Sequence, residues 1–109
     1  MVFWLKFGVG VKIIDNSLII SFDSKTKLDL LIKNVKLFYE NDSIKEDKTV
    51  VPIFLDNGKT DSFSLRVSDD LKIRTVTFIV KDNINKEQYA ISNCMKTNKI
   101  TMTEMLYNS

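Results

Sequence analysis

The residue types that this chain lacks exclude several kinds of chemistry. It contains no histidine among its 109 residues. Catalysis by a Ser-His-Asp or Cys-His arrangement would therefore have no imidazole base, and the commonest transition-metal ligand is missing. Cys94 is the single cysteine, so neither an intramolecular disulfide nor a cysteine-rich zinc site can form. A nearby cation, Lys96, could activate the thiol, but no partner base accompanies it, and we interpret Cys94 as a small, partly buried hydrophobic residue.

Two short patterns resemble ligand-binding motifs and lack essential parts of them. Gly8 and Gly10 form a Gly-x-Gly inside a strand-like run, without the third glycine and the following helix of a dinucleotide site. Residues 82–87 carry oxygen ligands at a loosely calcium-like spacing but lack the glycine and length of an EF-hand loop. We expect no metal, no cofactor and no enzymatic activity, and keep a calcium- or carbohydrate-binding module as a minor alternative.

Charge and hydropathy argue against nucleic acid and membrane as partners. The formal net charge is +2, and only Arg66 and Arg74 are arginines, the residue that best recognises phosphates and base edges. Lys36, Phe38 and Tyr39 interleave cations with aromatic rings, as in single-strand binding, but acidic residues within 40–47 would repel phosphate. No apolar run is long enough to span a membrane. We interpret the N-terminal apolar stretch as a strand rather than a signal peptide, and the absence of disulfides suits the cytoplasm.

The elements that would position any site follow from a period-two alternation of apolar and polar residues. Clusters of Asn, Asp, Gly and Lys interrupt it about every ten residues. Strands are predicted over 2–13, 18–22, 27–39, 49–55, 61–67, 71–81 and 88–93, and residues 100–105 are either a strand or a short helix. The prediction is an all-β fold, an antiparallel β-sandwich of seven or eight strands with immunoglobulin-like architecture, in a single domain over 1–109.

Local signals refine this arrangement. A change of alternation phase near Lys33 and Asn34 predicts a β-bulge, and Pro52 places its strand at a sheet edge. Asn57 and Gly58 predict a hairpin turn. Residues 40–48 are interpreted as the longest polar connection.

Because successive strands reverse direction, the turns should gather at two ends of the sandwich. One end collects Asp23, Asp56 and residues 82–87, and the other collects Asp15, the 40–48 loop and the Asp69-Asp70 turn.

The residues predicted to contact a partner come from two places. Trp4 shares a strand side with Lys6 and Lys12, and Trp is enriched at binding hot spots. The others, Tyr39, Asp42 and Lys45, lie in or beside the 40–48 loop.

The sequence thus favours a non-catalytic protein-binding module: an inhibitor, an adaptor or an assembly component. The alternative is a self-assembling subunit of a phage or surface assembly, a homo-oligomer through edge strands such as 49–55 or the first strand. The Lys-, Asn- and Ile-rich composition is typical of a low-GC genome and fits a phage or mobile-element origin.

Overall fold

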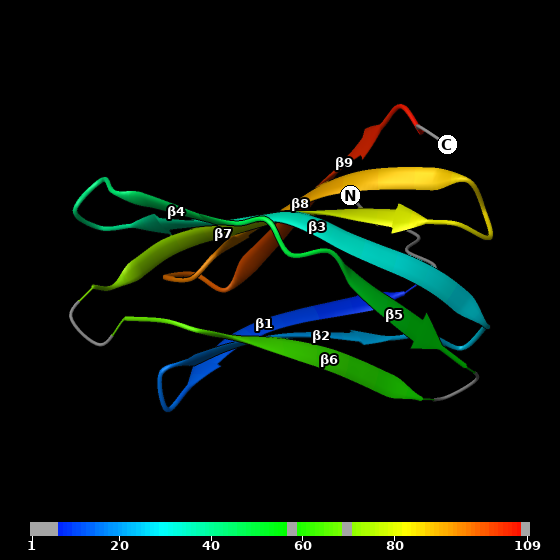
Figure 1. Cartoon of the computed structure of the whole chain (residues 1–109), viewed down its shortest axis with the longest axis horizontal. Coiled ribbons are helices and arrows are strands. Elements are labelled where there is room, and N and C mark those ends of the chain that lie inside the picture. Colours follow the sequence, from blue (N-terminus) through cyan, green and yellow to red (C-terminus); the bar gives the residue numbers. More distant parts are fainter. Residues whose placement is uncertain (1–6, 57–58, 69–70, 108–109) are drawn as a thin grey trace.

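The computed structural model describes residues 7–56, 59–68 and 71–107, which form two antiparallel sheets (Figure 1). Their nine strands are β1 (Gly8–Ile14), β2 (Ser17–Asp23), β3 (Leu28–Tyr39), β4 (Ile44–Asp47), β5 (Val51–Leu55), β6 (Thr60–Arg66), β7 (Ile73–Asp82), β8 (Glu87–Cys94) and β9 (Lys99–Met105). The all-β, antiparallel prediction is confirmed, and the tail that could have been a helix is a strand. The predicted count of seven or eight strands is too low, because the described residues form nine. In the described part of the chain, no helix is long and apolar enough to cross a membrane.

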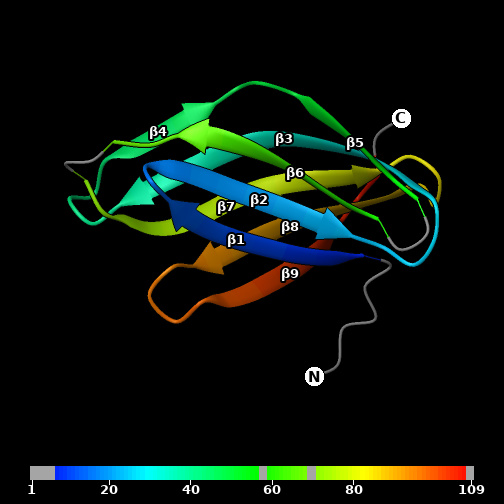
Figure 2. The same ribbon diagram turned by 90° about the horizontal axis from the view of Figure 1, so that it is seen from below.

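The two sheets form two layers that face each other (Figures 1 and 2). The smaller sheet has the order β1-β2-β6, and the larger has the order β4-β3-β7-β8-β9, with β5 pairing with β3 as well. Strand β7 lies between β3 and β8, as its apolar character on both sides requires. Since β4 and β5 pair with successive parts of β3, they share one edge of the larger sheet.

The core lies between the layers and is built from alternate residues of each strand. Phe22 of β2 meets Phe78 of β7 edge to face, with ring centroids 6.2 Å apart. Both side chains are almost completely buried. Burying an aromatic or branched aliphatic side chain contributes about 1.5–3 kcal/mol, so this alternation is what joins the sheets.

The bulge in β3 is confirmed. The β3–β7 register shifts between Lys33 and Lys36, and Asn34 has a φ of 55°, a conformation that Asn tolerates better than most residues. Before the bulge Ile32 faces the core, and after it Val35 does. The extra residue therefore keeps both halves of a long strand buried on the same side.

Residues 40–48 are not an irregular connection throughout, because Ile44–Asp47 form strand β4. Sequence reading missed this strand because it is short and almost entirely exposed, which leaves no apolar alternation. Its register with β3 opposes Ile44 to Phe38 and Glu46 to Lys36. Cross-strand pairs of this kind, apolar with apolar and acid with base, stabilise a sheet edge.

The predicted Asn-Gly hairpin is wrong in its pairing. Residues 57–58 are outside the described residues, and the Lys59 amide donates to the Asp56 carbonyl at 2.9 Å, so the chain does turn here. However, β5 pairs with β3, and β6 pairs with β2. This turn therefore carries the chain from one sheet to the other. Pro52 lies on an edge strand, as predicted.

The turns gather at two ends, as the reversal of successive strands predicts. The loop end, on the left of Figure 1, contains residues 15–16, 40–43, 67–68, 71–72 and 95–98. The far end, on the right, contains residues 24–27, 56, 59 and 83–86.

Candidate binding site at the loop end

The β3–β4 turn is held in one shape by its own backbone. The Tyr39 amide donates to the Ser43 carbonyl at 2.9 Å, and the Asp42 amide donates to the Tyr39 carbonyl at 3.0 Å. Asp42 has a φ of 67°, which Asp adopts at lower cost than bulkier residues. The Glu40 amide donates to the Lys72 carbonyl at 2.9 Å. These bonds fix the turn and join it to the residues that precede β7.

The residues predicted to contact a partner have different surroundings. Trp4 lies outside the described residues. Tyr39 is only 3% exposed and belongs to the core, so its side chain is not on a surface that a partner could touch. Asp42 and Lys45 are exposed on the same turn and strand. Asp42 pairs with Arg74 across a 3.2 Å separation of Oδ1 and Nη1.

Beside this turn the loop end contains a cavity of about 700 Å³. Its apolar lining comes from strands of both sheets and the segments that follow them: Ile13, Val67, Leu71, Ile73 and Met95. Pockets that bind ligands or partner side chains combine such an apolar lining with a few polar groups. The cavity is therefore the place at this end where an apolar side chain of another molecule could be buried.

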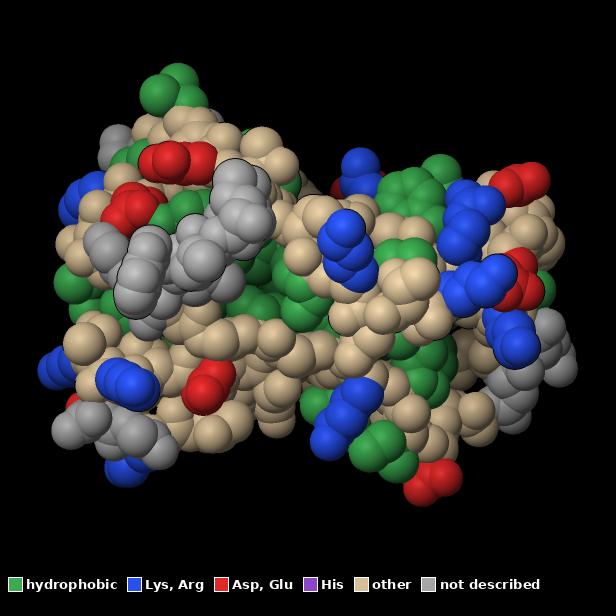
Figure 3. Space-filling model, turned by 180° about the vertical axis from the view of Figure 1, so that it is seen from behind, with side chains coloured by type: hydrophobic (Ala, Val, Ile, Leu, Met, Phe, Trp, Pro, Cys, Tyr) green, Lys and Arg blue, Asp and Glu red, His purple; other side chains and the backbone are tan. Residues whose placement is uncertain are grey.

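Polar and charged groups complete the lining. Lys72, Arg74 and Lys96 contribute cations, and Glu40 contributes a carboxylate. In Figure 3, where the loop end lies on the right, Lys and Arg side chains surround exposed hydrophobic atoms. A partner that entered the cavity would therefore meet an apolar interior and a polar rim, which is the usual anatomy of a protein interface.

The apolar residues of this cavity were not among the residues predicted to contact a partner. Ile13 and Ile14 are neighbours on β1, so they point to opposite faces, and they are 41% and 47% exposed. Two adjacent apolar residues directly before the Asp15-Asn16 turn were the available signal. Leu71 and Met95 lie outside the strands of the structure. Leu71 belongs to the alternation that predicts a strand over 71–81, and that pattern does not indicate a cavity.

The Cys94 thiol has polar neighbours that affect its ionisation. The residue is half-buried near the end of β8. A hydrogen bond from the Thr97 hydroxyl, with the backbone amides of Thr97 and Lys96 adding to it, lowers the pKa of the thiol. Among the described residues, no group of three or more His, Cys, Asp and Glu side chains could hold a metal ion.

In the turn at residues 82–87, whose spacing loosely resembles a calcium loop, the Asp82 carboxylate is hydrogen-bonded to other residues of the same turn. Asp82 is fully buried. Its Oδ1 accepts hydrogen bonds from the Ile84 and Asn85 amides at 3.1 Å, and its Oδ2 accepts one from Asn85 Nδ2 at 2.8 Å. A cation would have to displace these N–H donors, so this turn is not arranged as a calcium site.

The glycine pair has a local structural role. A Cβ atom at Gly8 would lie 2.1 Å from Oδ1 of Asp23 on β2, and one at Gly10 would lie 3.0 Å from the Ser21 hydroxyl oxygen. Gly8 is the first residue of β1, and Gly10 is interior to it. Their absence of a side chain allows this close approach of β2 side chains to the β1 backbone.

Comparison with protein-family models, with curated proteins and with solved structures finds no match to this chain.

Proposed function

We propose that this chain is a non-catalytic protein-binding module, an inhibitor, adaptor or assembly component, that engages its partner through the loop end. The observation that carries the proposal is the cavity of about 700 Å³, which is lined by apolar side chains together with charged ones. A buried anchor residue in such a pocket supplies much of the free energy of binding at protein interfaces.

The rigidity of the neighbouring turn supports the same proposal. Backbone hydrogen bonds hold residues 39–43 and join Glu40 to Lys72, so little conformational entropy would be lost there on binding. Asp42 is exposed on this turn and Lys45 on the strand that follows it, and they offer charges of both signs. Such charges orient a partner and select it rather than supply most of the affinity.

The architecture we propose for this module is an immunoglobulin-like sandwich. Two antiparallel sheets pack face to face, and loops cluster at both ends, as in that class of folds. The chain has no histidine, and the described residues hold no metal-ligand cluster. The proposal therefore assigns the chain no catalytic residue and no cofactor. We also propose that its partner is a protein rather than a nucleic acid or a membrane, and that it acts in the cytoplasm.

Affinity purification of the tagged chain from a lysate of its source cells tests the proposal. The expected result is one enriched protein in stoichiometric amount, whose recovery falls with Ile13→Asp in the cavity lining. Ile84→Asp is the matched control, because Ile84 is 49% exposed at the far end while Ile13 is 41% exposed at the loop end. Recovery of the bait alone, or equal recovery by both variants, would contradict binding at the loop end.

A further inference from the structure

The sheet edges differ in how they are protected against pairing with another strand. Natural edges are blunted by short strands, charges, proline or irregular backbone. At one edge of the larger sheet, β4 has four residues, three of them charged, and β5 contains Pro52. In the smaller sheet, β1 contains Gly8 and Gly10. Strand β6, also an edge in its sheet, lies against β5.

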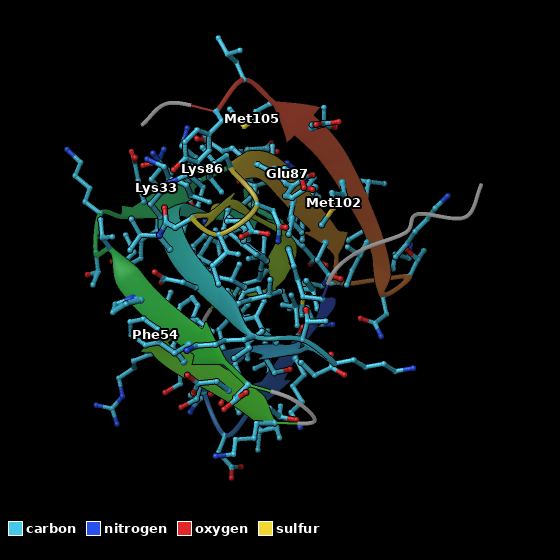
Figure 4. All side chains as sticks on the ribbon, turned by 90° about the vertical axis from the view of Figure 1, so that its right-hand side faces the viewer. Lys33, Phe54, Lys86, Glu87, Met102 and Met105 are labelled. Atoms are coloured by element: carbon cyan, nitrogen blue, oxygen red, sulfur yellow. The ribbon has the colours of Figure 1, made fainter. Side chains whose placement is uncertain are left out.

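Strand β9 has only one of these devices, a charge near each end. It is seven residues long, contains no proline or glycine, and carries charges only near its ends, at Lys99 and Glu104. Its register with β8 runs without a bulge from Lys99 to Met105. Figure 4 shows β9, with Met102 and Met105, on the opposite side of the molecule from Phe54 of β5. Within the described part of the chain, no strand pairs with the outer side of β9.

We propose that β9 pairs antiparallel with β9 of a second copy of this chain, about a two-fold axis at Met102. Antiparallel pairing of two identical edges produces a closed two-fold dimer, because each strand offers the same surface to the other. The backbone N–H and C=O groups on the outer side of β9 would then gain partners, and the two larger sheets would become one continuous sheet.

The side chains of β9 favour this register over its neighbours. Residues that oppose each other must share a face, so the register can shift only in steps that preserve alternation. Centring on Met102 pairs all seven residues of β9 and sets Thr101 opposite Thr103 of the second copy, twice. Thr–Thr pairs stabilise antiparallel strands. A shift of the register in either direction leaves some residues of β9 unpaired. A larger shift brings Lys99 opposite Lys99 in one direction and Glu104 opposite Glu104 in the other, and like charges opposite each other are destabilising.

The proposal adds a surface to the protein-binding function. No residue that lines the loop-end cavity belongs to β9. Variants of β9 should therefore change self-association without changing recovery of a partner by the cavity, and the two proposals fail separately.

Sedimentation equilibrium of the full chain from low micromolar to millimolar concentration tests self-association. The expected result is a mass that rises toward that of a dimer. The double variant Thr101→Lys with Thr103→Lys places like charges opposite each other twice, and should weaken dimerisation by roughly tenfold or more. The control is Thr60→Lys with Ser62→Lys, which adds the same charge to exposed positions of β6 and should leave dimerisation unchanged.

Opposite charges should restore the contact. Mixing the double lysine variant with Thr101→Glu and Thr103→Glu should give a mixed dimer, which also shows that both variants fold. A wild-type chain that stays monomeric throughout, or a dimer that both lysine pairs affect equally, would overturn the proposal.

Oxidative cross-linking tests the register. In a Cys94→Ser background, Met102→Cys brings two thiols together at the two-fold axis and should give a disulfide-linked dimer. Thr101→Cys in the same background should cross-link far less, because Thr101 opposes Thr103 of the second copy and not itself. Equal cross-linking of both variants, or more with Thr101→Cys, would overturn this register.

Discussion

The two ends of the sandwich use their polar groups in different ways. At the far end, polar side chains form hydrogen bonds and a cation–π contact with neighbouring residues of the same end. Asp82 accepts three hydrogen bonds within its own turn, and the Tyr89 hydroxyl donates to Glu87. The Tyr107 ring lies beneath Lys81, whose Nζ is 4.9 Å from the ring centroid. At the loop end, Lys72 and Lys96 are exposed beside a cavity lined by apolar residues.

We propose that the far end serves stability and that the loop end serves binding. A buried carboxylate that is hydrogen-bonded within its own turn, such as that of Asp82, gains little from a partner, because each new contact must replace an existing one. A cavity with an apolar lining gains free energy when a partner removes that lining from water.

Asp82→Ala should destabilise the fold by about 3 kcal/mol. The substitution removes a buried carboxylate and leaves the amides of Ile84 and Asn85 without their acceptor. Urea denaturation followed by tryptophan fluorescence or circular dichroism measures the change. The control, Glu46→Ala on exposed β4, should stay within about 0.5 kcal/mol. A loss below about 1 kcal/mol for Asp82→Ala would show that the far end does not depend on this turn.

Ile13→Asp should weaken partner binding by about 2 kcal/mol while leaving the chain folded. Ile13 lines the cavity and is 41% exposed, so a carboxylate there meets solvent in the free chain and loses it in the complex. Titration calorimetry with the purified partner measures the change. Ile84→Asp at the far end should bind like the wild type, and an equal loss for both variants would remove the contrast between the ends.

Raising the pH above about 10 should destabilise the fold in part through Tyr89. Burial, followed by the hydrogen bond to Glu87, raises the pKa of the Tyr89 hydroxyl above its usual value. A group with a raised folded-state pKa stabilises the fold fully below its unfolded pKa and loses that contribution as the pH rises through the folded one. Tyr89 is only half-buried, so solvent screening keeps the contribution below about 1 kcal/mol.

Thermal unfolding between pH 9 and pH 12, compared for the wild type and Tyr89→Phe, measures this effect. The wild type should lose more stability than the variant over that range. Parallel pH profiles would show that Tyr89 makes no such contribution.

Asp42→Asn should have the smallest effect, below about 0.5 kcal/mol on stability. The substitution removes the ion pair between Asp42 and Arg74. The side chain of Asp42 is 85% exposed and that of Arg74 is 51% exposed, and exposed ion pairs contribute little to stability. Asn also tolerates the positive φ at this position. Urea denaturation measures the change. A loss above about 1 kcal/mol would mean that this ion pair holds the loop end together.

The sequence predicted the features that periodicity and special residues encode. The alternation of apolar and polar residues predicted antiparallel sheets. The phase change at Lys33 and Asn34 predicted the β-bulge, and Pro52 predicted that its strand lies at a sheet edge. The pairing of β5 and β6 with different sheets could not be read from Asn57 and Gly58, because a turn signal does not say which strand lies across from each arm.

The candidate site was predicted less well than the fold. The loop end was correctly expected to gather distant turns, and Asp42 and Lys45 are exposed there. Tyr39 lies in the core instead, because the bulge puts it on the same side as Val35. Leu71 and Met95 line the cavity together with residues that are distant in the sequence. The alternation within a single segment does not predict such contacts.

Hydrogen exchange of the chain, free and bound to its purified partner, distinguishes binding at the loop end from binding at the far end. The proposed binding mode predicts slower exchange of loop-end amides in residues 15–16, 40–43 and 95–98 in the complex, with residues 83–86 unchanged. Protection of residues 83–86, with the loop end exchanging as in the free chain, would contradict it.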